Sequence, residues 1–386
     1  MRFLFLESFY GGSHRAFADG LVSRSGHRIE LVTLPARFWK WRMRGAALHF
    51  LKKVPDFSGY DGLIVTDLMS LADLKALAGP GLPPVLVYFH ENQLTYPLAP
   101  GEAMDFQFGF TDITTALAAD RVLFNSRFHF DAFFDQLPGF LKMMPEYRPV
   151  WCIERIREKA AVLYPGCRLP PAEAVFCRPG AAAAPPLVVW NHRWEFDKNP
   201  EECFEALAAV EERGVDFRLA LLGENFQAVP KAFLSAQERF ASRIVCCGYE
   251  PDRDRYLEWL RKGEVVVSTA VQENFGISVV EAVRCGCLPL LPNRLAYPEI
   301  LPEPAHADCL YDGPGDLVKK LVRLLTGFGG KETLRRALAA SMARFAWENV
   351  VEGYDAELER LAAKHEIRIS KSEVHPPKAG KNSKFE

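Results

Sequence analysis

The sequence predicts an α/β protein with two doubly wound parallel-sheet domains that face each other across a cleft. Short, almost continuously apolar runs alternate with helix-compatible segments, which is typical of parallel strands buried on both faces. The alternation occurs twice, and a stretch rich in Pro, Ala and Gly separates the two series. The chain has 386 residues and is 49% hydrophobic, so it is long enough to form two cores.

The expected strands, together with the stretch rich in Pro, Ala and Gly between the two series, define the domains. The strands are residues 2–7, 28–33, 62–66, 84–89, 121–126 and 161–165 in the first series, and 187–191, 217–223, 243–248, 264–269, 287–292 and 309–311 in the second. The pattern places an N-terminal domain at 1–166, a linker at 167–186 and a C-terminal domain at 187–345. A helix over 346–364 is expected to pack back on the N-terminal domain. The basic tail, 365–386, is expected to be disordered.

Composition and charge exclude several classes of protein. The net charge of −2 gives no overall attraction to nucleic acid, so any such binding must come from local patches. The nine cysteines form no CxxC pair, which favours reduced thiols in a cytoplasmic protein over a disulfide framework. Glu7 interrupts the first apolar run, which argues against a signal peptide, and no apolar stretch approaches membrane-spanning length.

The strongest local signal is "ENFGISVVEAVRCGCLPLL", which begins at Glu273. A strand is expected to end at 268–269, a loop then presents Glu273, and a helix begins near Gly276. The free N–H groups at that helix start would bind an anion, and Glu281 lies further along the same helix. Two carboxylates on either side of an anion site suit a sugar joined through a diphosphate to a nucleoside. The expected contacts are Glu273, Asn274, Phe275, Gly276, Ile277 and Glu281.

The segment "HRWEFDKNP" follows the expected strand 187–191 and places Arg193 and Lys198 five positions apart. Charged side chains at the end of a buried strand need partners. Two cations here would stabilise the negative charge that develops on a departing nucleoside diphosphate. The alternative is a surface salt-bridge cluster with Glu195 and Asp197.

Two loops of the N-terminal domain also follow expected strands. In "FYGGSHRAF", Gly11 and Gly12 permit a tight turn and close backbone approach, and Ser13 is expected to cap the next helix. In "YFHENQLTYP", His90 comes at a strand end and is expected at the cleft. Both loops therefore belong to the candidate site.

The Asp252-x-Asp254 spacing is the one acidic pair that suggests a metal. A helix pattern follows directly, so helix capping and first-turn acids explain the two residues. No other cluster has metal-ligand spacing, and we expect neither a metal nor another cofactor.

Residues 34–53, "LPARFWKWRMRGAALHFLKK", combine six Lys or Arg residues with interleaved aromatic rings and no acid. Such a segment suits a nucleic-acid backbone together with stacked bases. The alternative is an amphipathic segment whose tryptophans pack inward. The nucleic-acid interpretation names Arg37, Trp39, Lys40, Trp41, Arg42 and Arg44.

The Glu-x7-Glu motif in this setting resembles the retaining glycosyltransferases of the GT-B fold, which have two Rossmann-like domains. The resemblance covers nearly the whole chain. It implies that Glu273 contacts the donor sugar and Glu281 the nucleotide ribose, while Arg193 and Lys198 hold the diphosphate. The C-terminal domain would then bind the nucleotide sugar and the N-terminal domain the acceptor.

The same resemblance assigns roles to the N-terminal loops. It places the Gly11–Gly12 loop beside the diphosphate, and it implies that His90 contacts a donor-sugar hydroxyl or backs the anomeric carbon. The implied catalytic residues are His90, Arg193, Lys198 and Glu273.

Several longer strings are similar to a narrower family, the tRNA-queuosine α-mannosyltransferases. They are "FYGGSH", "LPARFWKWRMR", "YFHENQLTYP", "DFQFGFTD", "HRWEFDKNP" and "AYPEILP". The similarity implies transfer of mannose from GDP-mannose to queuosine at the tRNA wobble position, with retained configuration and without a metal. Asn274 departs from the pattern, because an aromatic residue is expected after the first Glu.

Other interpretations stay open at this point. A GT-B transferase that acts on a lipid or polysaccharide would use the same donor residues. A noncatalytic tRNA-binding protein could keep the same scaffold, although the intact Glu and Arg/Lys sets speak against this. A sugar-nucleotide epimerase would need an acid/base set of its own, which we do not find. The donor sugar, the tRNA species and the oligomeric state are left open.

Overall fold

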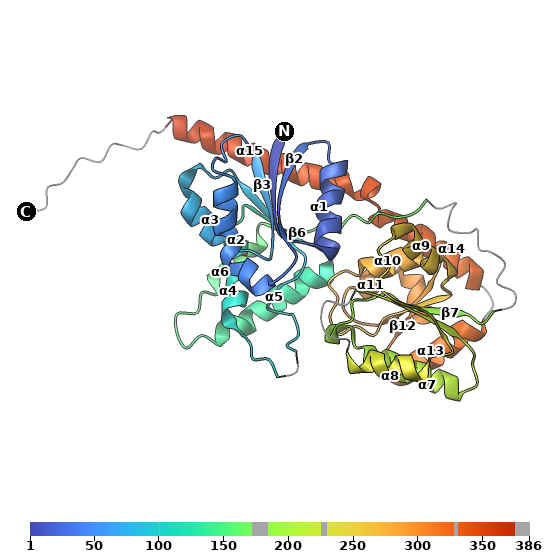
Figure 1. The fold of residues 1–386 in the computed structure, drawn as a ribbon. Helices are drawn as coiled ribbons and strands as arrows, with labels where there is room; N and C mark the ends of the chain where they lie inside the picture. Colours follow the sequence, from blue (N-terminus) through green and yellow to red (C-terminus); the bar gives the residue numbers. More distant parts are fainter. Residues whose placement is uncertain (100, 172–183, 225–229, 328–330, 375–386) are drawn as a thin grey trace, which may run out of the picture.

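The computed structural model describes residues 1–99, 101–171, 184–224, 230–327 and 331–374. It contains two six-stranded sheets side by side, each flanked by helices (Figure 1). All strand pairs are parallel, and the orders are β2-β1-β3-β4-β5-β6 and β12-β11-β10-β7-β8-β9. The predicted α/β class with two doubly wound sheets is confirmed.

The strands coincide closely with the predicted apolar runs. They are β1 (Arg2–Tyr10), β2 (Arg28–Pro35), β3 (Gly62–Thr66), β4 (Val85–Phe89), β5 (Arg121–Phe124), β6 (Ala160–Val162), β7 (Leu187–Trp190), β8 (Arg218–Leu222), β9 (Ile244–Gly248), β10 (Val265–Val267), β11 (Leu288–Pro292) and β12 (Leu310–Tyr311). Most of their side chains are buried, because helices cover both faces of each sheet.

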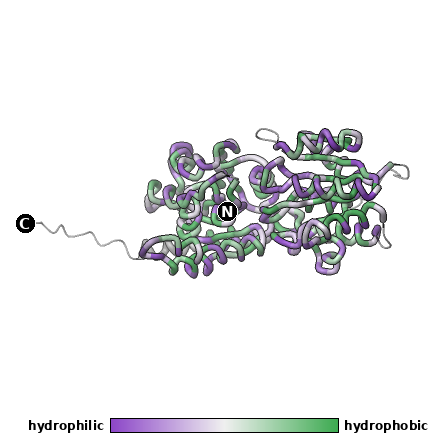
Figure 2. The backbone as a smooth tube through the Cα atoms, turned by 90° about the horizontal axis from the view of Figure 1, so that it is seen from below, coloured by the Kyte–Doolittle hydropathy of each residue, from purple (hydrophilic) through white to green (hydrophobic). Residues whose placement is uncertain are grey.

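The helices of the first domain are α1 (Gly12–Arg24), α2 (Trp39–Lys53), α3 (Leu71–Ala78), α4 (Phe106–Ala118), α5 (Arg127–Lys142) and α6 (Trp151–Arg157). Those that follow are α7 (Pro200–Glu212), α8 (Lys231–Arg239), α9 (Arg253–Lys262), α10 (Ile277–Arg284), α11 (Tyr297–Ile300), α12 (His306–Cys309), α13 (Pro314–Thr326), α14 (Lys331–Ser341) and α15 (Trp347–Val374). Figure 2 shows hydrophobic and hydrophilic residues alternating along these helices, as expected for helices with one buried face.

The first sheet separates two hydrophobic layers. Phe3 and Phe5 of β1 point toward α1 and α15, whereas Leu4 and Leu6 of the same strand point toward α2 to α6. This alternation follows from the two-residue period of a strand. The second sheet lies in a separate core that includes Trp190, which is fully buried.

The chain crosses between the domains twice, and the two crossings lie side by side. The backbone N–H of Cys167 donates to the carbonyl of Phe345 (2.7 Å), and that of Trp347 donates to Cys167 (3.3 Å). Trp347 then packs so tightly against Gly20 and Gly166 that a Cβ at either glycine would lie 2.1 Å from its ring. The start of α15 is thus locked onto the first domain.

The expected start of the tail differs from the structure, and most of the expected linker cannot be compared with it. Helix α15 continues to Val374, so residues 365–374, expected in a disordered tail, are helical. The helix continues because no Gly or Pro occurs between Gly353 and Pro376. Residues 375–386 and linker residues 172–183 lie outside the described residues.

We predict that Trp347→Ala lowers the free energy of unfolding by about 3–5 kcal/mol, because truncating a buried aromatic side chain leaves a cavity. The measurement is a denaturant titration followed by circular dichroism. Trp41→Ala is the matched control, since Trp41 is 77% exposed, and should change stability by no more than about 0.5 kcal/mol. Equal effects of the two substitutions would contradict the packing described here.

Candidate functional site

The loops after β7 and β10 carry the motifs of the second domain. They meet at the point in the sheet where the strand order reverses, between β10 and β7. Strands β7 and β10 are neighbours in the sheet, although they lie far apart in the sequence. The loop after β7 carries Arg193 and a short 3-10 helix, Phe196–Lys198, and the loop after β10 carries Glu273. Ligands of doubly wound sheets bind at such a reversal, outside the carboxyl ends of the strands.

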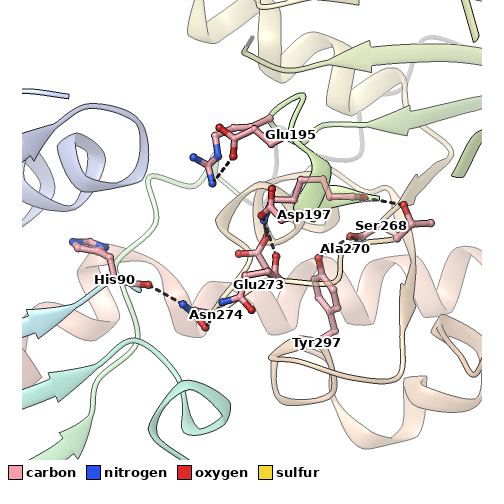
Figure 3. A network of polar contacts seen from close by, with 12 residues as sticks. His90, Glu195, Asp197, Ser268, Ala270, Glu273, Asn274 and Tyr297 are labelled. Carbon is pink, nitrogen blue, oxygen red and sulfur yellow. Dashed lines mark hydrogen bonds and ion pairs between the residues drawn. The ribbon is translucent and has the colours of Figure 1, made fainter. Parts of the chain in front are cut away.

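Lys198 holds these two loops together through contacts with Asp197 and Glu273, both of which are labelled in Figure 3. Its buried ammonium lies 3.1 Å from Asp197 and 3.4 Å from Glu273, and it donates to the carbonyl of Gln272 (2.8 Å). Burial opposes the charge, but Glu273 and Asp197 outweigh it and raise the pKa of Lys198. The sequence motif therefore places a charged lysine against the first glutamate of the Glu-x7-Glu pair.

Arg193 is placed differently, because its side chain is 45% exposed and pairs with Glu195 at 3.2 Å. The salt-bridge alternative therefore describes part of the geometry. Arg193 pairs with Glu195 near the surface, and Lys198 pairs with Asp197 in the interior. Arg193 also influences Tyr96 of the first domain, whose hydroxyl pKa is raised by burial and by Asp197, against the opposing charge of Arg193. Tyr96 therefore lies near Arg193; it belongs to the "YFHENQLTYP" motif but was not among the predicted site residues.

Helix α10 begins at the site as expected. Gly276 precedes it with φ +101°, a left-handed conformation that favours glycine. Within the described parts of the chain, the N–H groups of Ile277 and Ser278 have no acceptor, so they are free to bind an anion. Phe275 differs from expectation, because its ring packs in the core against Phe345 (5.1 Å) and only its backbone can face a ligand.

Glu281, the second glutamate, is largely buried and forms an ion pair with Arg253 at 2.6 Å. Arg253 is the first residue of α9, and the same guanidinium donates to the carbonyl of Arg168. Asp252 caps this helix by accepting from the N–H groups of Asp254 and Arg255, which confirms the capping interpretation of Asp252. The partner Arg253 was missed, because nothing in the sequence links it to Glu281.

Two contacts join the carboxyl edges of the domains. Asn274 donates to the carbonyl of His90 (3.3 Å), as Figure 3 shows. Glu299 of "AYPEILP" accepts from the backbone N–H groups of Arg127 (2.7 Å) and Phe128 (3.0 Å), at the start of α5. A carboxylate from one domain thus caps a helix of the other. Sequence reasoning did not identify Glu299 as a capping residue.

A buried polar cluster occupies the same edge of the first domain. Nδ1 of His14 lies 3.3 Å from Glu7, and the ring of His14 lies 4.0 Å from that of His90, tilted by 33°. Burial disfavours the imidazolium, but Glu7 outweighs it and raises the pKa of His14 to about 9. Burial, with the charge of His14, lowers the pKa of His90 well below its usual range.

Glu7, His14 and His90 offer ligand atoms within 4.8 Å of one another, a spacing that could hold a metal ion. The expectation that no cluster has metal-ligand spacing overlooked this group, because β1, α1 and β4 contribute one residue each. Nδ1 of His14 is turned toward Glu7, and the ring of His90 packs against the ring of His14 at 4.0 Å. We therefore interpret the group as an ion pair beside a neutral histidine.

The glycine loop that precedes His14 is built without the expected cap. Gly11, with extended backbone, is the residue before α1, and Ser13 makes no capping hydrogen bond. The expectation for Ser13 is wrong because the helix begins two residues earlier than a Ser13 cap requires. Gly12 has φ +49°. A Cβ at Gly11 would lie 2.4 Å from that of Ala36. The loop therefore packs against the segment that leads into the basic helix.

The basic helix α2 presents its aromatic residues unequally. Trp41 is 77% exposed, and Phe38, which precedes the helix with φ +57°, is 70% exposed. Trp39 instead packs on Phe108 (5.1 Å), so the inward-packing alternative holds for this one tryptophan. Trp41 is therefore exposed, as the nucleic-acid interpretation requires. Phe38 is also exposed, but it was not among the residues named for that interpretation.

The cations of this helix have different surroundings. Lys40 pairs with Glu102 (3.2 Å), and Arg44 donates to Gln107 (2.6 Å), at exposed positions. Arg42 donates to the carbonyl of Pro35, which fixes the loop before the helix. Arg37 is exposed and makes no side-chain hydrogen bond or ion pair with another described residue.

Comparison with known proteins agrees with this geometry. The sequence model of the tRNA-queuosine alpha-mannosyltransferase N-terminal region matches residues 2–167, and that of glycosyl transferases group 1 matches residues 177–336. A tRNA-queuosine alpha-mannosyltransferase of Drosophila melanogaster is 40% identical over 329 residues, which are 82% of this chain and 85% of the relative. The chain belongs to the tRNA-queuosine alpha-mannosyltransferase family. It is a glycosyltransferase enzyme.

More distant relatives share parts of the chain or the fold alone. A GDP-mannose-dependent alpha-(1-6)-phosphatidylinositol dimannoside mannosyltransferase of Mycobacterium tuberculosis is 25% identical over 177 residues, covering 46% of this chain and 44% of the relative. A sucrose-phosphate synthase from Thermosynechococcus elongatus superposes with a TM-score of 0.73 at 15% identity, covering 94% of this chain and all of that one. The fold is therefore GT-B. Among the described residues, no helix is long and apolar enough to cross a membrane.

We predict that Arg193→Ala and Lys198→Ala each reduce glycosyl transfer by roughly two to three orders of magnitude, because each removes a cation from a forming anion. Turnover is measured on purified variants whose fold is verified by circular dichroism. Lys319→Ala, an exposed cation on α13, is the control and should leave turnover unchanged. A folded Arg193→Ala variant with near-wild-type turnover would exclude Arg193 from the site.

Proposed function

We propose that the protein transfers mannose from GDP-mannose to queuosine at the wobble position of a tRNA anticodon, with retention of configuration. The observation that carries this proposal is the 40% identity to the Drosophila enzyme, which extends over 82% of the chain. The GDP-mannose-dependent mannosyltransferase of Mycobacterium tuberculosis, which matches 46% of the chain, supports GDP-mannose as the donor. The reaction places the enzyme in the cytoplasm, where it meets tRNA.

The donor is proposed to lie over the loops after β7 and β10. Arg193, Lys198 and the free N–H groups at the start of α10 bind the diphosphate, while Glu273 contacts the sugar and Glu281 the ribose. These preformed positive groups stabilise the departing GDP without reorganising during the reaction. The acceptor hydroxyl attacks from the side of the leaving group, and the departing phosphate oxygen takes its proton.

His90 is proposed to support the sugar from the first domain. Its backbone is fixed by Asp67, which accepts from the His90 N–H at 2.8 Å, and by Asn125, which donates to the His90 carbonyl at 2.9 Å. The side-chain Nε2 is buried and has no partner among the described residues. Nε2 of a neutral imidazole in this position can donate a hydrogen bond to a sugar hydroxyl or accept one from it, depending on the tautomer.

The direct test is to incubate the protein with bulk tRNA and a panel of sugar nucleotides, and then to weigh the nucleosides after digestion. We expect queuosine to gain the mass of one hexose with GDP-mannose and to stay unmodified with the other donors. Transfer from GDP-mannose to a lipid or polysaccharide, with unmodified tRNA, would replace the proposed acceptor. No transfer to any acceptor, with intact tRNA binding, would favour the noncatalytic alternative.

The acceptor surface generates a second prediction. Replacing Arg37, Lys40, Arg42 and Arg44 together with Gln should weaken tRNA binding and flatten its dependence on salt, because fewer phosphate contacts release fewer counterions. GDP-mannose affinity, measured by calorimetry on the same variant, should not change. Trp41→Ala should cost about 1–3 kcal/mol of tRNA binding if a base stacks on it. An unaltered tRNA affinity and salt slope would move the acceptor surface elsewhere.

Metal independence gives a third prediction. The lysine, the arginine and the α10 start supply positive charge at the diphosphate, so we expect EDTA to leave transfer intact. The measurement is the initial rate with and without chelator. Loss of activity that Mg²⁺ or Mn²⁺ restores would refute this, and it would redirect attention to Glu7, His14 and His90.

A further inference from the structure

The Glu7–His14 pair lies at the cleft edge of the first sheet, and the proposed mechanism gives it no role. Glu7 is fully buried, and Oε1 accepts from the N–H of Phe9 (2.7 Å) and the hydroxyl of Thr66 (3.1 Å). The same oxygen lies 3.3 Å from Nδ1 of His14. Three segments of the domain thus hold this carboxylate in one orientation, with the histidine directed toward it.

The other nitrogen of the imidazole is directed outward. The His14 side chain is buried except for 7% of its surface, and the contact of Nδ1 with Glu7 is an ion pair without hydrogen-bond geometry, whereas Nε2 makes no hydrogen bond with another described residue. With Nδ1 turned toward Glu7, Nε2 presents an N–H to whatever lies in the cleft. His14 lies two residues after Gly12, and the space around the Gly12 backbone is open, so a ligand can approach it closely.

We propose that Glu7 positions His14 as an anion-binding residue and that the Nε2–H group of His14 donates to a phosphate oxygen. This inference rests on the proposed function, which brings two phosphate-bearing substrates to the cleft. The shared chemistry is a charge-assisted hydrogen bond from an imidazolium. Its source is either the donor diphosphate or an anticodon phosphate of the acceptor, and the experiment separates the two.

The charges around His14 favour the imidazolium. Glu7 on β1, Asp67 after β3 and Glu91 after β4 all act to raise the pKa of His14, whereas burial acts to lower it, and the result is about 9. His90, whose ring lies 4.0 Å from that of His14, stays neutral. Because the pKa in the folded protein is above the ordinary value, the charge is present at neutral pH and disappears only as the pH rises through about 9.

The test measures binding of GDP, of GMP and of tRNA to His14→Gln. If the phosphate belongs to the donor, GDP affinity falls about ten- to a hundredfold and GMP affinity falls less, because GMP lacks the outer phosphate. If it belongs to the nucleic acid, GDP affinity is unchanged, and the salt slope of tRNA binding drops by about one. Either result supports the proposal and names the source.

His27→Gln is the matched control, because His27 lies 3.6 Å from Glu359 in another His–Glu pair, and it should alter none of these affinities. A folded His14→Gln variant with unchanged GDP and tRNA affinities would overturn the proposal. Wild-type protein that binds neither ligand would instead refute the proposed function, so the two failures are distinct.

The role of Glu7 is tested through pH. Wild-type affinity for the responsive ligand should be retained at pH 8, above the range in which the terminal phosphate of GDP titrates, and should fall above about 9. Glu7→Gln should bind weakly at pH 8 and recover toward acid pH, because His14 then becomes charged only at lower pH. Glu7→Asp keeps the carboxylate, so its affinity at pH 8 should lie between those of the wild type and Glu7→Gln. It replaces Glu7→Gln in the test if that variant does not fold. A pH-independent loss in both variants would limit Glu7 to a structural role and contradict the inference.

Discussion

The site of the second domain depends on the contacts of the buried Lys198 ammonium. It joins the loop after β7 to the loop after β10 through Asp197, Glu273 and the carbonyl of Gln272. Asp197 is itself fully buried, so its carboxylate needs a cation nearby. Removing one partner of a buried ion pair leaves an uncompensated charge, which typically costs about 3–5 kcal/mol. The ion pair that shapes the loops therefore also orders the first glutamate of the motif.

The remaining contacts keep the two carboxyl edges opposed. The paired crossings at Cys167 and Ala346 join the domains, and the carboxylate of Glu299, which also accepts from the hydroxyl of Tyr164 near the crossing, adds a second link at the start of α5. Charges enclosed between two domains interact more strongly than they would in water. Burial opposes each of these charges, so the ionised side chains occur as pairs of opposite charge, and the cations among them suit an anionic ligand.

Much of this arrangement could be predicted because its signals are local. Apolar runs marked the strands, and the spacing of Glu273 and Glu281 marked the helix that begins at the site. Asp252 was recognised as a helix cap because a cap and its helix are adjacent in sequence. Periodicity, caps and short motifs extend over a few residues, and the fold class follows from their order.

Other features depend on contacts between distant segments. Glu7 and His90 are brought together only when β1 and β4 enter one sheet, and Arg253 meets Glu281 only after α9 and α10 pack. Trp39 is half-buried against Phe108 of α4, whereas Trp41 is exposed, and this difference depends on a contact between separate helices. A side chain's role in such cases is set by its tertiary neighbours, which spacing along the chain does not reveal.

The central claim is that a nucleoside diphosphate binds between the two carboxyl edges, and hydrogen–deuterium exchange with and without GDP tests it most directly. The account predicts slower exchange in the peptides that contain residues 192–199 and 273–281, and in the peptide that contains the Gly11–Gly12 loop. The α4–α6 surface lined by Thr114 and Trp151 should be unchanged. Protection confined to that surface, or none in the three loops at saturating GDP, would contradict the account.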